Sequence, residues 1–345
     1  MRAFGAQLFR FGPNAGAHRV AVRCAVSVGV PMLVLLMSGR LDLLGAAAFG
    51  AFTAVFGRDL IGAARARMQA ITGGALTASV AIGLAAAHLP GRPWSSTLVV
   101  ILVAVAATVL GNVVQWKPAG PLFFVFASGA FAGGVPLELA AAVLVAAVTA
   151  ASAGFAILVG ATGGLLRRHG RGMPHAAPTR GRRRDAAGAG MLVDVLVASS
   201  VAGTLAILLG LEHVYWVVLS AVVPASVSLH GPWLAKGTLR VVGTTAGLIV
   251  AAPLLMLQLP GWAVVLVALA LQLGTELFVP RNYGVAMLFI TPLALLISNA
   301  AHPGPVSILL SDRFWGTVVG ITVGLVVLAA RAVVMRGRGA RAALS

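Results

Sequence analysis

The chain has 345 residues, of which 59% are hydrophobic and only 10% are charged, with a mean hydropathy of +1.00 and a net charge of +17. Because a soluble domain carries about 25% charged residues, this composition excludes an ordinary soluble protein and predicts an all-α integral membrane protein. The basic residues lie in short hydrophilic breaks and in one central run, as in the cytoplasmic loops of membrane proteins, so we expect no nucleic-acid partner.

Apolar runs follow one another along the whole chain. A transmembrane helix needs roughly 20 apolar residues, and on that basis the sequence predicts twelve spans, six in each half. The second and fifth of each half are short and contain Gly or Pro, so ten spans is the alternative. The expected spans are roughly 20–38, 43–57, 68–88, 96–116, 119–135, 138–165, 191–210, 214–230, 237–258, 261–279, 283–300 and 306–330.

A basic, Pro- and Gly-rich segment separates the two halves. We expect an N-terminal six-helix repeat at 1–166, a linker at 167–190 and a C-terminal six-helix repeat at 191–345. The linker has no apolar period, so it is predicted to be a flexible cytoplasmic segment that contacts the anionic headgroups of the lipid bilayer.

The distribution of positive charge predicts the orientation. With twelve spans and a cytoplasmic N-terminus, all but three of the 25 Lys and Arg residues fall on the cytoplasmic side; the exceptions are Arg40, Arg92 and Arg313. Because Lys and Arg concentrate in cytoplasmic loops, both termini are expected to be cytoplasmic. In this topology Arg313 belongs to an outer segment.

One sequence pattern recurs in the two halves. Arg240 is followed at helical spacing by small residues that end at Gly247, and Arg67, 173 residues earlier, is followed in the same way by residues that end at Gly74. Positions i, i+3 and i+7 share one helix face. The pattern predicts matching helices in two parallel repeats, related by an axis along the membrane normal.

No motif of a soluble enzyme is present. The sequence lacks a nucleophile elbow, a Walker loop and a zinc-binding HExxH helix, and it has no Cys/His cluster with metal-ligand spacing. We therefore expect no catalytic residue, no enzyme activity, no cofactor and no metal.

Polar residues within the spans are the candidates for function, because such groups are costly in a membrane. Arg67, Lys236 and Arg240 lie at the cytoplasmic starts of helices. Two interpretations stay open: they anchor the helices at the interface, or Arg67 and Arg240 flank a central path and attract an anion.

Two carboxylates lie near the interiors of spans. If transport is coupled to protons, Asp194 or Glu276 is the expected carrier, since a desolvated carboxylate can titrate near neutral pH. The alternative is a salt bridge to a nearby arginine such as Arg281.

The second half resembles the fusaric acid resistance and aromatic acid exporter family. Four segments together carry this resemblance, and each alone is weak; they are Tyr215–Ala221, Lys236–Gly247, Asn282–Pro292 and Arg313–Gly320. Residues 18–165 resemble a degenerate partner repeat. A more distant similarity is to plant aluminium-activated malate transporters, anion channels that pair six-span subunits around a pore.

The resemblance implies a multi-pass protein of the plasma (inner) membrane that exports aromatic carboxylic acids or similar organic anions. Tyr283 and Thr291 lie in its segments and join Arg67, Lys236 and Arg240 as candidate substrate-binding residues. A passive anion channel and a non-transporting membrane scaffold remain the alternatives. The sequence predicts no oligomeric state.

Overall fold

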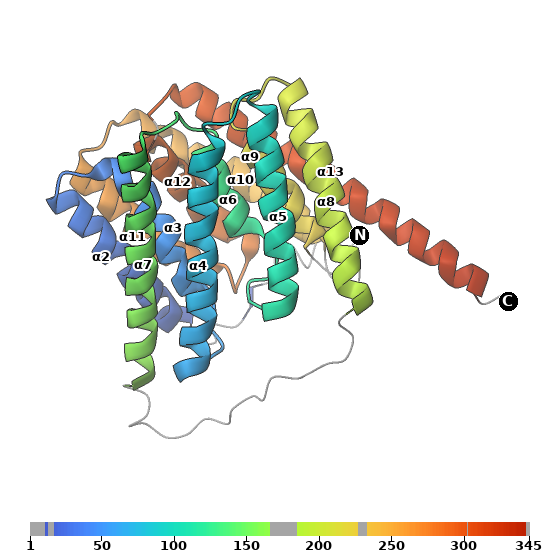
Figure 1. Ribbon diagram of the computed structural model, residues 1–345, viewed down its shortest axis with the longest axis horizontal. Coiled ribbons are helices and arrows are strands. Elements are labelled where there is room, and N and C mark those ends of the chain that lie inside the picture. The colour runs from blue at the N-terminus through green and yellow to red at the C-terminus, as the bar shows by residue number, and fades with distance from the viewer. Residues whose placement is uncertain (1–10, 13–16, 166–184, 227–232, 302, 343–345) are drawn as a thin grey trace.

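The computed structural model describes residues 11–12, 17–165, 185–226, 233–301 and 303–342 (Figure 1). Within these ranges every element is a helix and no strand occurs, which confirms the predicted all-α fold. Helices are expected in a membrane because they satisfy all their backbone hydrogen bonds internally. Most of the predicted linker lies outside the described residues, and from Asp185 onward the chain is already helical.

The described part of the N-terminal half contains six α-helices and two short 3-10 helices. They are α2 (Ala17–Met37), η1 (Leu41–Leu43), α3 (Leu44–Ala51), η2 (Phe52–Val55), α4 (Gly62–Ala86), α5 (Trp94–Val114), α6 (Leu122–Ala132) and α7 (Leu139–Leu165).

Among its described residues, the C-terminal half contains six α-helices, the last of which runs well beyond the bundle (Figure 1). They are α8 (Asp185–Leu208), α9 (Val214–Ala225), α10 (Trp233–Met256), α11 (Gly261–Phe278), α12 (Tyr283–Ala301) and α13 (Val306–Ala342).

Nine of the described helices are long and apolar enough to cross a membrane, and three further apolar helical segments are shorter. The short ones are Leu41–Val55, α6 and α9. Three of the four spans predicted to be short are therefore short. The fourth, α12, is a full-length candidate span with Pro292 inside it.

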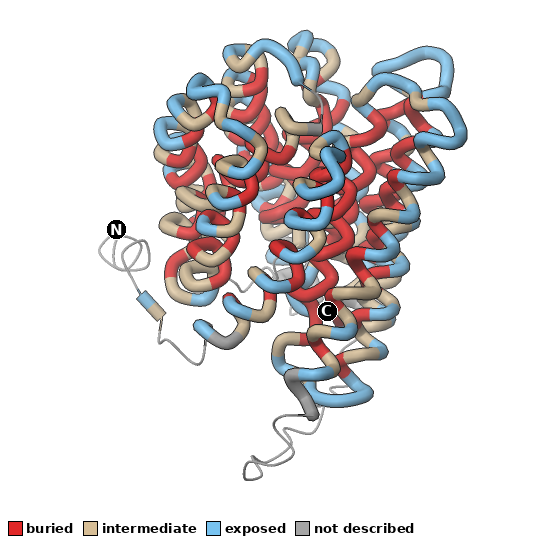
Figure 2. Tube along the Cα trace, turned by 90° about the vertical axis from the view of Figure 1, so that its left-hand side faces the viewer, coloured by how far each residue is buried: buried red, intermediate tan, exposed pale blue. Residues whose placement is uncertain are grey.

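The short helices lie inside the bundle. Every residue of α3 and of α9 is buried, whereas the long helices turn apolar side chains outward, and Figure 2 shows the buried residues gathered in the interior. The outward apolar side chains of the long helices can face lipid. The short helices cannot cross a bilayer by themselves, and they are covered by the other helices of the bundle instead. The exposed apolar side chains include Leu98, Leu102, Val143, Leu158, Ile249 and Val326.

The same helix pairs pack in each half. In the N-terminal half α4 packs against α6 and α7, and α3 packs against α7; in the C-terminal half α10 packs against α12 and α13, and α9 packs against α13. Between the halves, α2 packs against α11 and α5 packs against α8, while α6 meets α9 and α3 meets α12. The short interior helices thus lie where the halves meet.

The glycines of α10 lie on a packed face of the helix. A Cβ atom on Gly247 would lie 2.7 Å from the carbonyl oxygen of Met287 and 2.8 Å from Cβ of Thr291, so α10 and α12 approach closely at this point. In α4, by contrast, Arg67 and Gly74 are exposed, and a Cβ atom on Gly74 would meet nothing within 4 Å. The predicted copy in α4 therefore does not lie on the packed face of its helix.

Alanine substitutions at Gly247 and Gly74 should have different effects on thermal stability, because only Gly247 is closely packed. Gly247→Ala should lower the melting temperature, because overpacking against a backbone costs about 1–3 kcal/mol. Gly74→Ala should leave it unchanged or raise it, because alanine has the better helix propensity. Thermal unfolding of the purified chain in detergent measures both, and a Gly247→Ala variant as stable as the wild type would contradict the close packing.

Candidate functional site

A cavity of about 780 Å³ lies where the two halves meet. We call it the central cavity. Its walls come from α3, η2 and α6 of the N-terminal half and from α9, α10, α11, α12 and α13 of the C-terminal half. Its volume is within the usual range of small-molecule sites, roughly 300–1,000 Å³.

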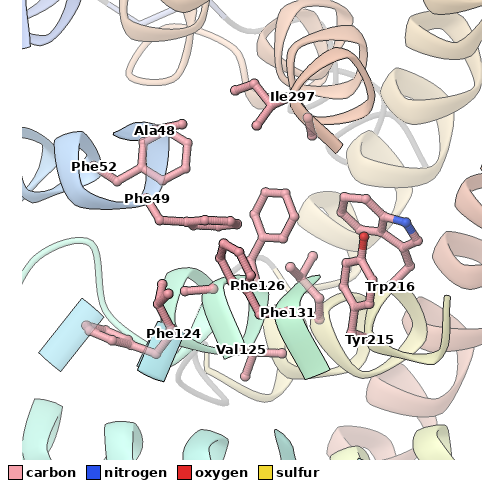
Figure 3. Packing of buried hydrophobic residues seen from close by; sticks show 14 of the residues in the cluster. Ala48, Phe49, Phe52, Phe124, Val125, Phe126, Phe131, Tyr215, Trp216 and Ile297 are labelled. Atoms are coloured by element: carbon pink, nitrogen blue, oxygen red, sulfur yellow. The ribbon is translucent and has the colours of Figure 1, made fainter. Parts of the chain in front are cut away.

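One wall of the central cavity is aromatic. Phe49 and Phe52 are three residues apart on α3 and η2, and Phe123 and Phe126 have the same spacing on α6, so each pair shares a helix face. The ring centroids of Phe52 and Phe123 lie 5.4 Å apart, and those of Phe49 and Phe126 lie 4.9 Å apart (Figure 3). Trp216 of α9 continues this wall.

The charged residues of the central cavity are mostly cations. Two acidic residues line it, Asp59 and Glu276, against six basic ones. The basic residues are Arg58, Lys117, Lys236, Arg240, Arg281 and Arg313. Asp59 and Lys117 are largely exposed and mark its mouth. The cavity is therefore apolar in its walls and positive in its net charge.

Three of the predicted substrate-binding residues meet in this cavity. Lys236 and Arg240 are four residues apart on α10 and face Tyr283 at the start of α12. Arg240 Nη1 donates a hydrogen bond of 2.7 Å to the hydroxyl of Tyr283, and Lys236 Nζ lies 5.7 Å from the centroid of the Tyr283 ring. Arg240 is buried, and its Nε has no partner among the described residues.

The structure does not bring the other two predicted residues to the central cavity. Arg67 is exposed; the buried arginine of α4 is Arg65, which donates to the carbonyl oxygens of Gly57 and Gly160. Thr291 is buried on α12 against Gly247. Arg67 and Arg240 thus do not share a cavity wall. The cause is the rotation of α4, whose larger buried residues Leu76 and Val80 face the core.

Sequence reasoning missed Arg313. The predicted topology counted it with the outer segments, although the predicted span 306–330 contains it. In the structure α13 begins at Val306, so Arg313 lies about two turns into the helix, is 1% exposed and lines the central cavity. Its guanidinium carbon lies 4.0 Å from the centroid of the Trp216 ring. A signal was present: Arg313 begins the same Arg-x-x-Gly-x-x-x-Gly pattern that begins at Arg240.

The two predicted proton carriers differ in position. Glu276 lines the central cavity; its Oε2 lies 3.1 Å from Arg58 Nη2 of the other half, and its Oε1 accepts a hydrogen bond of 3.3 Å from Gln272. Asp194 lies on α8, forms an ion pair with Arg331 of α13, and is not among the residues that line the cavity. Both carboxylates therefore form salt bridges, though neither with Arg281.

A second cavity of about 330 Å³ lies between α5, α6 and α9. Tyr215 lines it, whereas Phe126 and the next residue, Trp216, line the central cavity. The ring centroids of Tyr215 and Trp216 are 4.6 Å apart, and those of Phe126 and Trp216 are 4.9 Å apart. Phe49, Phe126, Tyr215 and Trp216, which we call the aromatic cluster, thus separate the two cavities (Figure 3).

No group of three or more His, Cys, Asp or Glu side chains in the described ranges is placed to hold a metal ion. The residues that line the central cavity offer positive charge, hydrogen-bond donors and aromatic surface.

The ion pair between Arg58 and Glu276 should hold the two halves together. Because each single substitution leaves a charge without its partner, Arg58→Gln and Glu276→Gln should each destabilise the protein, by about 3 kcal/mol. The double variant should be less destabilised than the sum of the two. Chemical unfolding of the four proteins measures this coupling, with Asp42→Asn in the exposed Arg40–Asp42 pair as the control. A coupling of zero would contradict a stabilising pair.

Comparison with known proteins gives one match. The family described as fusaric acid resistance protein-like matches residues 200–327, from the middle of α8 to α13. No curated protein and no solved structure matches the chain. The match includes Arg240, Glu276, Tyr283 and Arg313 of the central cavity. The resemblance seen in the sequence is confirmed over this stretch: residues 200–327 of this multi-pass membrane protein match the fusaric acid resistance protein-like family.

Proposed function

We propose that this protein is a transporter that exports organic anions, aromatic carboxylates foremost, through the central cavity. The observation that carries the proposal is the pairing of aromatic walls with an excess of cations in one cavity between the halves. A match to a family named for resistance to fusaric acid agrees with this role.

The charge of the cavity favours an anionic substrate. A cation is costly in an apolar environment unless a counter-ion or a set of hydrogen bonds compensates it. The two acidic residues of the cavity already have partners, since Asp59 lies near Lys117 and Glu276 pairs with Arg58. Arg240 and Arg313 have no carboxylate partner among the described residues, so an incoming anion would supply the missing charge.

The walls of the cavity favour an aromatic substrate. Aromatic rings pack in stacked or edge-to-face geometry and gain about 0.5–1.5 kcal/mol beyond simple burial. Phe49, Phe52, Phe123 and Phe126 offer such faces next to the cations. An aromatic carboxylate can therefore place its ring on one wall and its charge on the other.

The two halves form a parallel duplication in this proposal, with the path near their common axis. The repeated packing of equivalent helices in each half supports it. We place both termini in the cytoplasm and the protein in the plasma (inner) membrane. The mouth of the central cavity, marked by Asp59 and Lys117, then opens toward the cytoplasm, where an exporter must load its substrate.

Glu276 is the better candidate for coupling to protons. It faces the substrate cavity and shares Arg58 with any anion that enters, so the anion and the Glu276 carboxylate compete for one cation. Displacement of Glu276 from Arg58 would favour its protonation. Asp194 is paired with Arg331 away from the cavity, and we assign it a structural role.

Flux in proteoliposomes tests the proposed function. A panel of aromatic carboxylates, measured against protein-free liposomes, should cross faster when the opposite compartment is acidic. Glu276→Gln should lose the response to the pH gradient, whereas Asp194→Asn should keep it. Voltage-driven current without a response to pH would identify a channel, and an absence of flux for every acid would leave only a scaffold.

The aromatic cluster should act as the barrier of the path. Phe126→Ala opens space between the two cavities and should raise the passive leak of small anions in proteoliposomes without any gradient of protons. Phe124→Ala is the matched control, because Phe124 lies on the same helix but stacks on Trp116, 4.7 Å away, outside both cavities. Equal leak through the two variants would contradict a barrier at Phe126.

A further inference from the structure

Arg313 is a buried cation with free hydrogen-bond donors. Its side chain is 1% exposed and lines the central cavity, yet its Nε and Nη1 have no hydrogen-bond partner among the described residues. A buried guanidinium without partners is unfavourable. The stacking on Trp216 compensates only part of this cost, because a cation–π contact is weaker than a charged hydrogen bond.

Trp216 offers a further free donor beside Arg313. The indole Nε1 is buried and has no partner within the described residues. In Figure 3 this nitrogen lies on the edge of the ring turned away from Phe126, so it does not point into the other aromatic rings. Two residues in contact with each other therefore present three donor nitrogens that have no partner among the described residues, at one wall of the cavity.

The nearby carboxylates do not pair with these donors. Asp312, the neighbour of Arg313 in sequence, accepts hydrogen bonds of 2.8 Å from both the backbone N–H and Nδ1 of His213. Glu276 pairs with Arg58. Arg240, a second cation at the central cavity, repels the charge of Arg313. An anion at this wall would relieve the repulsion and accept the free donors together.

The position of Arg313 is fixed by a close helix contact. A Cβ atom on Gly316 would lie 2.9 Å from Cβ of Trp216, and one on Gly320 would lie 2.6 Å from Cβ of Ser220, so α13 lies directly against α9. Arg313 is one turn before Gly316 on the same face. This contact sets the guanidinium over the Trp216 ring, which makes the site preorganised rather than formed on binding.

We propose that Arg313 and Trp216, with Arg240 beside them, form a carboxylate-binding site in the central cavity. The ligand class is an organic acid with a free carboxylate, whose remaining body lies against Phe126 and Phe49. Arginine suits this task because its planar fork of donors matches a carboxylate. The assignment rests on the proposed function and specifies which residues bind the charged end of its substrate.

Equilibrium binding tests the site without relying on transport. The full chain is placed in nanodiscs of phosphatidylcholine alone, so that no anionic lipid headgroup competes, and is titrated with benzoate and with benzamide, its neutral counterpart. The wild type should bind benzoate at least about tenfold more tightly than benzamide, since only benzoate supplies charge. Arg313→Gln should weaken benzoate at least about 30-fold and leave benzamide unchanged.

Two variants serve as comparisons. Arg313→Lys keeps the charge but loses the planar fork, so its benzoate affinity should fall between those of the wild type and Arg313→Gln. Arg40→Gln removes a cation from an exposed ion pair outside the cavity and should bind benzoate as the wild type does. Equal benzoate affinity in the wild type and Arg313→Gln would overturn the site but leave the proposed function standing. A wild type that neither binds nor carries any organic anion would refute the proposed function itself.

Thermal stability separates a binding role from a structural one. If the charge of Arg313 is uncompensated until an anion binds, the melting temperature of Arg313→Gln should equal or exceed that of the ligand-free wild type, because the substitution removes an uncompensated buried charge. The same variant should lose the rise in melting temperature that benzoate gives the wild type. A lower melting temperature together with an unchanged benzoate effect would show that Arg313 only fixes α13 to α9, and would overturn the proposal.

Discussion

The desolvation of positive charge inside an apolar bundle is the constraint on which the site depends. Arg240 and Arg313 are both buried next to one cavity, and neither has a carboxylate partner among the described residues. Such an arrangement opposes stability unless something else compensates the charge. We propose that the transported anion supplies this compensation. The other buried ion pairs, Arg58–Glu276 and Arg331–Asp194, are complete without a ligand.

Glycines on the packed faces of α10 and α13 determine the positions of Arg240 and Arg313. Gly243 and Gly247 let α10 approach α12, and Gly316 and Gly320 let α13 approach α9, in each case one and two turns after an arginine. The helices that receive them contribute Tyr283 and Trp216, the aromatic partners of Arg240 and Arg313. The same glycine spacing thus occurs twice in the C-terminal half, and each time the close helix contact that it permits orients one guanidinium group.

The sequence predicted the all-α fold and the order of the apolar helices. It also selected Lys236, Arg240, Tyr283 and Glu276 as candidate functional residues, and the structure places all four at the central cavity. The sequence alone did not show which side chains of a helix turn toward the interior of the bundle. Spacing shows that Arg67 and Gly74 share a face, but which face turns inward depends on how the bulkier residues of α4 pack. Arg313 was counted with an outer segment although the predicted span 306–330 contains it, and spacing alone does not show that its side chain lines the central cavity. Exposed Arg67 and buried Arg313 look alike in sequence.

A structure with a heavy-atom ligand tests the central claim most directly. The protein would be crystallised with 4-bromobenzoate, and the anomalous signal of bromine would locate the ring while the density locates the carboxylate. We expect the carboxylate within hydrogen-bond distance of Arg313 and the bromine toward Phe49 and Phe126. A carboxylate bound instead to Lys117 at the mouth, with Arg313 still unpaired, would contradict the proposed binding site.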